Sequence, residues 1–147
     1  MKLVAGILVL LCAALGAAGC GDGDKNDFIN DYNDIVRKYR SLPGEVGSAI
    51  SGASNQTDAR LEKQFSDLAT RTRNEADELA QLDPPDDAKD EYDAYVAGLR
   101  EVARHLDDVA EAAKAHSTSK ARKAAESLVD DAQELTREED ALKKAVE

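Results

Sequence analysis

The sequence is poor in the residues that build β-rich or disordered chains. Its 147 residues contain no tryptophan, three prolines and nine glycines, and only 4% of them are aromatic. These counts are too low for a protein made of many strands and turns, and too low for a disordered chain. The length allows no more than one domain of ordinary size.

Positive charge is also scarce. The chain has 19 Lys and Arg against 30 Asp and Glu, so its formal net charge is −11. Proteins that bind nucleic acid present a basic surface to the phosphate backbone. The charge balance therefore argues against nucleic acid as a partner of this protein.

The first twenty residues have the pattern of an export signal. Lys2 supplies one positive charge, residues 3–15 form an apolar run, and residues 16–19 are all glycine or alanine. A cationic start, an apolar stretch of about 7–15 residues and a zone of small residues together describe a signal peptide. We therefore expect the protein to be exported.

Residues 17–20 (AAGC), preceded by Leu15, resemble the lipobox of bacterial lipoproteins, although Ala17 stands where leucine is commoner. The resemblance implies cleavage between Gly19 and Cys20 and acylation of the Cys20 sulfur by fatty chains such as palmitate. It implies a protein anchored in the lipid bilayer, on the extracytoplasmic face of a bacterial cell membrane. An ordinary cleaved signal and an uncleaved span of about 18 residues are the alternatives.

Processing at Cys20 would leave an acidic body on a short tether. Loss of residues 1–19 removes one lysine and no acid, so the net charge of −11 becomes −12. Cys20 would be the only remaining cysteine, which leaves no partner for an intramolecular disulfide. Residues 20–26 are polar and flexible, and residues 27–147 are the expected domain. An anionic bilayer surface would repel this domain, so we expect it to be tethered but not adsorbed.

From residue 27 on, apolar residues recur every three or four positions, which is the period of an amphipathic helix. The first pattern covers about residues 27–53 and contains Pro43-Gly44, which we expect to kink or interrupt the helix. A loop of composition SGASNQT follows. The second pattern runs from Leu61 to Leu82 and stops at Pro84-Pro85, because a residue before proline avoids helical geometry.

The third pattern starts after Pro85, with Asp83, Asp86 and Asp87 as expected caps. Its apolar positions are Ala88, Tyr92, Tyr95, Leu99, Val102, Leu106, Val109 and Ala113. Residues 116–119 break it, and Ser117 or Ser119 is a natural N-cap for the last helix. That helix has a weaker apolar face, interrupted by Glu139. Its apolar positions are Ala121, Ala125, Leu128, Ala132, Leu135, Leu142 and Val146.

These narrow apolar stripes and short connections predict an all-α fold, an up-down four-helix bundle that follows the signal helix. A three-helix bundle with a loosely docked C-terminal helix is the alternative. In either antiparallel order, acidic residues gather at the end near the membrane anchor. The opposite end holds five basic residues, which partly complement the helix dipole and are a candidate site for an anionic envelope polymer or protein. They are Lys114, His116, Lys120, Arg122 and Lys123.

Residues that would carry catalysis or hold a cofactor are scarce. Glu101, His105 and Asp108 share one helix face and would allow a weak metal site, but a solvated helix flank explains the same spacing. We therefore predict no metal, no other cofactor and no enzymatic activity. The four tyrosines are expected to be core residues whose hydroxyls reach solvent.

Two functions are consistent with these observations. The first is a membrane-anchored envelope lipoprotein with a small helical-bundle body, acting as a non-enzymatic spacer or interaction module. The second is a sensor-type envelope bundle that binds a ligand or a metal ion, with a cavity among the aromatic residues of the first and third helices. A cavity inside the bundle would favour the second function over a simple spacer.

Overall fold

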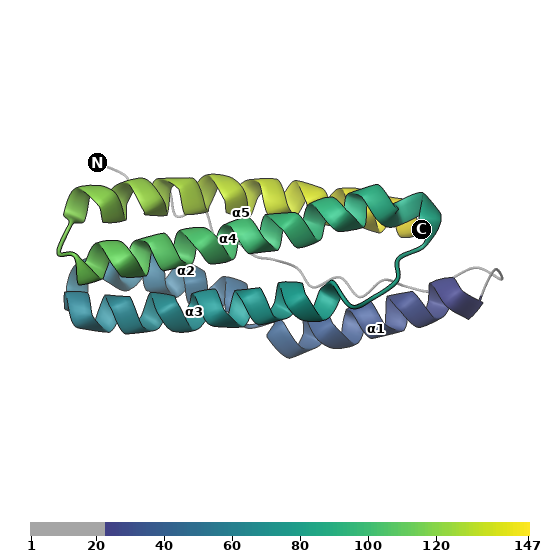
Figure 1. Cartoon of the computed structure of the whole chain (residues 1–147), viewed down its shortest axis with the longest axis horizontal. Helices are drawn as coiled ribbons and strands as arrows, with labels where there is room; N and C mark the ends of the chain where they lie inside the picture. The colour runs from purple at the N-terminus through teal and green to yellow at the C-terminus, as the bar shows by residue number, and fades with distance from the viewer. Residues whose placement is uncertain (1–22) are drawn as a thin grey trace.

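The computed structural model describes residues 23–147, and within this range every regular element is helical (Figure 1). The elements are α1 (Gly23–Tyr39), α2 (Leu42–Gly52), the 3-10 turn η1 (Ala53–Asn55), α3 (Asp58–Leu79), the 3-10 turn η2 (Asp86–Ala88), α4 (Lys89–Lys114) and α5 (Thr118–Val146). The fold is the predicted all-α helical bundle, with α1 and α2 forming one broken helix. The predicted signal helix and the Gly19-Cys20 cleavage site lie outside the described residues.

Pro43 explains why the first helix is broken. It occupies the first turn of α2, directly after the break at Arg40 and Ser41. A proline inside a continuous helix would lose one backbone hydrogen bond, and its ring would clash with the carbonyl four residues earlier, at Tyr39. In the first turn of a new helix the missing N–H has no such cost. The predicted interruption at Pro43-Gly44 is therefore confirmed, and it lies a few residues earlier than the proline itself.

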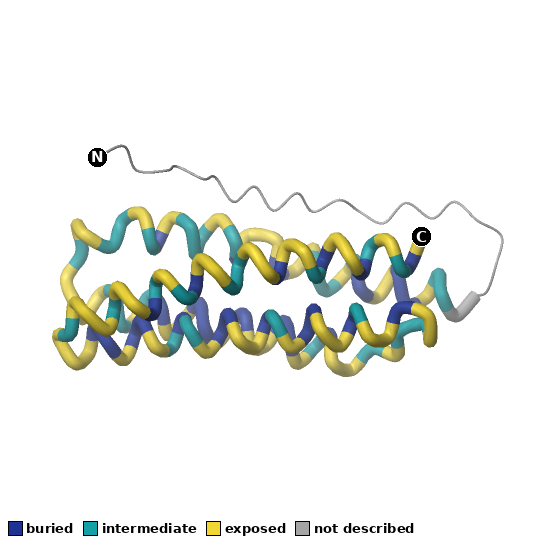
Figure 2. The backbone as a smooth tube through the Cα atoms, turned by 90° about the horizontal axis from the view of Figure 1, so that it is seen from above, coloured by how far each residue is buried: buried dark blue, intermediate teal, exposed yellow. Residues whose placement is uncertain are grey.

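The antiparallel order brings the expected elements together at each end of the bundle. Helix α4 packs along its length against both α3 and α5, and the turn η2 contacts α5 (Figure 1). The ring of Phe28 in α1 meets that of Tyr92 in α4 edge-on, with centroids 5.3 Å apart. The start of α1, the α3–α4 connection and the end of α5 thus share one end. Buried residues line the inside of every helix (Figure 2).

The third predicted pattern describes α4 correctly, whereas the last one needs a correction. All eight apolar positions predicted for α4 are buried. In α5, Ala124 is buried and Ala125 is only half-buried, so the face is turned by one residue at the start of this helix. Glu139 interrupts the apolar face as predicted, and it is 6% exposed. No helix among residues 23–147 is apolar enough over sufficient length to cross a bilayer.

The start of α4 differs from the prediction. Helix α3 ends at Leu79, three residues before Leu82, and the chain then crosses Pro84-Pro85 into η2. Helix α4 begins only at Lys89, and no side chain caps its first turn. The aspartates expected as caps therefore act at most through the helix dipole. Ser117 does occupy the N-cap position of α5, but its hydroxyl oxygen accepts no capping hydrogen bond from the first turn of the helix.

A Schellman motif ends α4. The N–H of Ser117 donates to the carbonyl of Ala112 at 2.9 Å, and that of His116 donates to Ala113 at 3.0 Å. These bonds satisfy two of the last carbonyls of the helix. They require a left-handed residue at position 116, and His116 has φ of 51°. Glycine is the usual residue there, because a side chain on a left-handed residue crowds its own carbonyl.

We predict that His116→Gly is more stable than His116→Ala by about 1 kcal/mol in free energy of unfolding. Both substitutions remove the exposed ion pair with Asp58, whose loss costs little. Only glycine also relieves the left-handed strain. Urea denaturation of the two variants measures the difference. Equal stabilities, or a more stable alanine variant, would contradict this interpretation of the turn.

Candidate functional site

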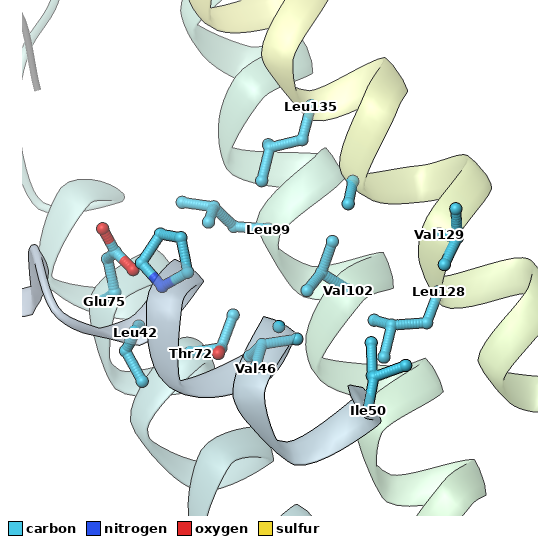
Figure 3. Close-up of a pocket in the computed structure, with 13 residues that line it drawn as sticks. Leu42, Val46, Ile50, Thr72, Glu75, Leu99, Val102, Leu128, Val129 and Leu135 are labelled. Carbon is cyan, nitrogen blue, oxygen red and sulfur yellow. The ribbon is translucent and has the colours of Figure 1, made fainter. Parts of the chain in front are cut away.

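An apolar cavity of about 90 Å³ lies between α2 and α5 (Figure 3). Helix α2 forms one wall and α5 the other, while residues of α3 and α4 form the floor. The lining residues are Leu42, Pro43, Val46, Gly47, Ile50, Thr72, Glu75, Leu99, Val102, Leu128, Val129, Ala132 and Leu135. Eleven of these thirteen are apolar or glycine, so the cavity is suited to an apolar group.

The cavity exists because the bundle does not close on this side. The backbone of α2 packs on α3, and no extensive backbone contact joins α2 to α5. Val129 of α5 is left 40% exposed at the edge of this gap. An exposed apolar side chain that belongs to a continuous apolar surface often marks a site where a ligand or another protein binds. We call this cavity and its open edge the α2–α5 groove.

One carboxyl lies at an end of the groove. Glu75 projects from α3 beside Leu42 in Figure 3, and the whole residue is only 8% exposed. No hydrogen bond contributes to its environment. Burial, followed by the charges of Glu139 and Glu78, raises the pKa of Glu75 from 4.5 to about 7. The groove therefore ends in a carboxyl that gains or loses its proton near neutral pH.

The two glutamates near Glu75 both have cationic partners. Glu139 of α5 accepts a contact from Lys143 Nζ at 2.8 Å. Glu78 of α3 accepts hydrogen bonds from Lys38 Nζ at 2.5 Å and from the Tyr39 hydroxyl at 2.6 Å. These donors lower the pKa of Glu78. Of the three carboxyls, Glu75 is the one without a donor.

Two tyrosines complete a polar layer in the core. Tyr32 of α1 and Tyr95 of α4 are each 3% exposed, and their ring centroids are 6.2 Å apart. The hydroxyl of Tyr32 is buried without a hydrogen-bond partner among the described residues. Burial, reinforced by Glu139, strongly raises the pKa of Tyr32, so the phenol is neutral at physiological pH.

The prediction that the tyrosines belong to the core is confirmed, but the expected exposure of the hydroxyls is wrong for Tyr32 and Tyr92. The Tyr92 hydroxyl donates to the buried carbonyl of Leu79 at 2.5 Å, and the Tyr32 hydroxyl is also buried. The end of α3 leaves carbonyls free to accept such a bond. The aromatic residues among which a ligand cavity was predicted contact one another, since the ring of Phe28 packs on those of Tyr32 and Tyr92. The groove is lined instead by aliphatic residues of α2 and α5.

The weak metal site considered for Glu101, His105 and Asp108 has a different arrangement. Arg104 bonds Glu101 at 2.7 Å and Asp108 at 3.2 Å, and its Nη2 lies 2.8 Å from Nε2 of His105. A guanidinium can only donate, so Nε2 of His105 accepts from Arg104. The hydrogen of the neutral ring is then on Nδ1, which donates a hydrogen bond to the carboxylate of Asp131 in α5. Among residues 23–147, no three metal-ligating side chains are grouped to hold an ion. These residues join α4 to α5 instead.

The predicted basic tip does gather around the α4–α5 turn, but its charge is mixed. Its residues are Lys114, His116, Lys120, Arg122 and Lys123. The ring of His116 is paired with Asp58 of α3 at 2.6 Å, and Arg122 lies 3.8 Å from Glu126. Acids from neighbouring turns thus offset part of the positive charge. Binding of an anionic partner here stays a prediction.

No family model, curated protein or solved structure matches the chain. The site is therefore defined by its own geometry. Sequence reasoning missed Glu75, although a signal for it was present: it lies three residues after Thr72 and four before Leu79, on the buried stripe of α3. A charged residue at such a position is buried with the stripe that carries it.

We predict that the free energy of unfolding falls as the pH rises from about 4.5 to about 7. Folded Glu75 holds its proton up to about pH 7, whereas an unfolded glutamate ionises near 4.5, so the folded state binds more protons in this window. The loss amounts to about 3 kcal/mol at most. Glu75→Gln should abolish this pH dependence and be more stable than the parent at pH 8, as measured by urea denaturation across pH.

Glu78→Gln is the matched control, because Glu78 lies one turn away and its pKa is lowered instead of raised. It should gain no stability at pH 8. The other strongly shifted carboxyl, Glu45, acts at lower pH: hydrogen bonds from Arg71 lower its pKa to about 2, so its contribution is lost only below about 4.5. A Glu75→Gln variant that keeps the parent's pH dependence would contradict the assignment.

Proposed function

We propose that this protein is an exported bacterial lipoprotein, anchored to the extracytoplasmic face of the cell membrane through acylated Cys20. The lipobox-like residues 17–20 support this proposal. They lie outside the described residues, so the support comes from the sequence. Two or more acyl chains on one cysteine make an anchor effectively stable. The helical bundle would then be held at the membrane by a short polar tether.

Within this setting, we propose that the bundle is a non-enzymatic binding module whose ligand enters the α2–α5 groove. The observation that carries this proposal is the apolar cavity of about 90 Å³ with one buried carboxyl at its end. A bundle acting only as a spacer would gain stability from a closed core, because an unfilled cavity loses dispersion contacts. An apolar lining with few polar groups is the common design of small-molecule sites.

We predict that Cys20→Ser abolishes membrane anchoring. Only a thiol at this position can accept the acyl chain, so the variant should lose the acyl mass and leave the membrane fraction. Cys12→Ser is the matched control, because Cys12 lies inside the apolar run of the signal. Mass spectrometry of the protein made in a bacterial host, with membrane fractionation, measures both effects. A Cys20→Ser variant that still carries acyl mass would overturn the anchor proposal.

We predict that benzene binds in the groove and that Gly47→Leu prevents it. Gly47 lines the groove, and an added Cβ there meets no atom within 4 Å, so a side chain can start at this position and occupy the groove. Binding is measured by chemical shift changes of the methyl groups of Leu99, Val102 and Leu128. A closed apolar cavity of about 150 Å³ is known to bind benzene, so in this cavity of about 90 Å³ the ring would extend into the open edge beside Val129.

Gly44→Leu is the matched control for this experiment. Gly44 lies in the same helix and an added Cβ there also meets no atom within 4 Å, but it lines a separate polar cleft against α3. Both substitutions raise helix propensity by the same amount, so a change in α2 stability is common to both. Benzene should bind Gly44→Leu like the parent. If neither benzene nor the smaller probe 1-butanol shifts the groove methyls of the parent, the binding proposal is removed and the spacer remains.

A further inference from the structure

We propose that the ligand of the α2–α5 groove is a short apolar chain that ends in a cationic amino group, with the ammonium bound at Glu75. This inference rests on the proposed binding function and specifies the chemical class of the ligand. Its basis is the charge of the groove and the hydrogen-bonding groups at its end.

The lining of the groove contains one ionisable residue, and that residue is acidic. Glu75 is the carboxyl, and no lysine, arginine or histidine lines the cavity. A ligand carboxylate or phosphate would therefore meet a negative group without any compensating cation. An ammonium would meet the opposite charge at a site shielded from water, where such a pair interacts more strongly than on an exposed surface.

The groups around Glu75 on the other helices leave this position unneutralised. On α1, Lys38 is committed to Glu78, and the hydroxyl of Tyr39 bonds the same carboxyl. On α5, Lys143 is paired with Glu139. On α4, Tyr95 is a neutral phenol whose pKa is raised by burial, and Tyr32 on α1 is equally neutral. A cation supplied from outside would thus be the first direct partner of Glu75.

Two oxygen acceptors at this end suit a primary ammonium. Thr72 lies one turn before Glu75 on α3, and both line the cavity. The Thr72 hydroxyl donates its hydrogen to the carbonyl of Leu68 at 2.9 Å, so toward the groove its oxygen can only accept. An ammonium carries three N–H donors and no acceptor. The Glu75 carboxylate and the Thr72 oxygen could receive two of these donors.

The size of the cavity limits the apolar part of the ligand. A dry cavity of about 150 Å³ holds benzene, so the cavity here, about 90 Å³, suits an alkyl chain of about three or four carbons. A longer chain would leave through the open edge beside Val129, which is 40% exposed. The aliphatic walls of α2 and α5 would cover the enclosed carbons.

The experiment compares three four-carbon probes on the full chain in phosphatidylcholine nanodiscs at pH 8, with empty nanodiscs as the blank. The probes are n-butylammonium, 1-butanol and butyrate. Hydrogen bonds to a charged group contribute about 1.5–3 kcal/mol, so n-butylammonium should bind at least about tenfold more tightly than 1-butanol. Butyrate should bind more weakly than 1-butanol. Methyl chemical shifts of Leu99, Val102 and Leu128 give the dissociation constants.

Glu75→Gln and Glu78→Gln separate the charge effect from packing. Glu75→Gln should remove the preference for the ammonium and leave 1-butanol binding unchanged. Glu78→Gln should keep the preference, because Glu78 does not line the cavity. In the parent, the preference should weaken as the pH falls from 8 to 6 and the Glu75 carboxyl takes up its proton.

The outcomes distinguish this inference from the proposed function. If 1-butanol binds and n-butylammonium binds no more tightly, the inference is overturned while the groove remains a binding site. The inference also fails if Glu75→Gln retains the preference for the ammonium. If neither benzene nor 1-butanol shifts the groove methyls, the binding function falls, and the inference with it.

Discussion

The architecture depends on helix α4, which packs along its length against both α3 and α5 and makes the most extensive contacts of any helix among residues 23–147. Its apolar face supplies buried residues from Tyr92 to Ala113, and α3 and α5 lie against it on either side. The broken helix formed by α1 and α2 joins this three-helix layer chiefly through α3. Because Pro43 divides that helix, its second half is short and is positioned separately from the first. One side of the bundle is therefore closed at the α1 end and open at α2.

This division separates two kinds of core. At the α1 end the rings of Phe28, Tyr32, Tyr92 and Tyr95 fill the space between the helices. At the α2 end the corresponding residues are small or aliphatic, and they leave the groove unfilled. Edge-to-face and tilted aromatic contacts add stability beyond the area that they bury. The aromatic end thus stabilises the fold, while the aliphatic end can leave space for a ligand.

The polar layer lies between these two regions. Glu139 is paired with Lys143, whose side chain is 20% exposed and reaches it from the next turn of α5 at 2.8 Å. Glu75 has no such partner, and burying an unpaired charge is expensive, so the proton remains on the carboxyl to higher pH. At neutral pH the buried carboxyl of Glu75 lowers the free energy of unfolding. Leucine or methionine would pack at the same position without this cost. This cost is the physical argument for a functional use of Glu75.

Most of the fold could be predicted from the sequence, because apolar spacing reports which face of a helix is buried. The pattern predicted seven of the eleven buried positions of α4, the interruption at Pro43 and the break before α5. It did not predict the left-handed His116, since the Schellman motif is set by the chain path between α4 and α5 and glycine is its usual marker. It also placed Ala125 in the core where Ala124 lies, because runs of alanine give a weak apolar contrast.

The candidate site was harder to predict, because a cavity forms where the side chains of two helices do not reach each other. The apolar positions of α2 and α5 were recognised individually, yet nothing in their spacing indicates that the two helices fail to meet. That failure follows from how α2 is held: Leu42 and Ala49 are its buried residues, and Arg71 of α3 bonds Glu45. All of these contacts face α3 or the core beneath it, and none fixes the distance between α2 and α5.

The same attachment makes α2 the element best able to adapt to a ligand. It has 11 residues, two of them the internal glycines Gly44 and Gly47, and short glycine-containing helices have little stability of their own. Elements with few buried contacts open at lower free energy than the core to which they are attached. A ligand in the groove would add contacts between α2 and α5 that the free protein lacks, and these would stabilise α2 most. Helix α2, the less stable wall of the groove, would therefore be stabilised most by a bound ligand. Helices α3, α4 and α5 hold Glu75 in place.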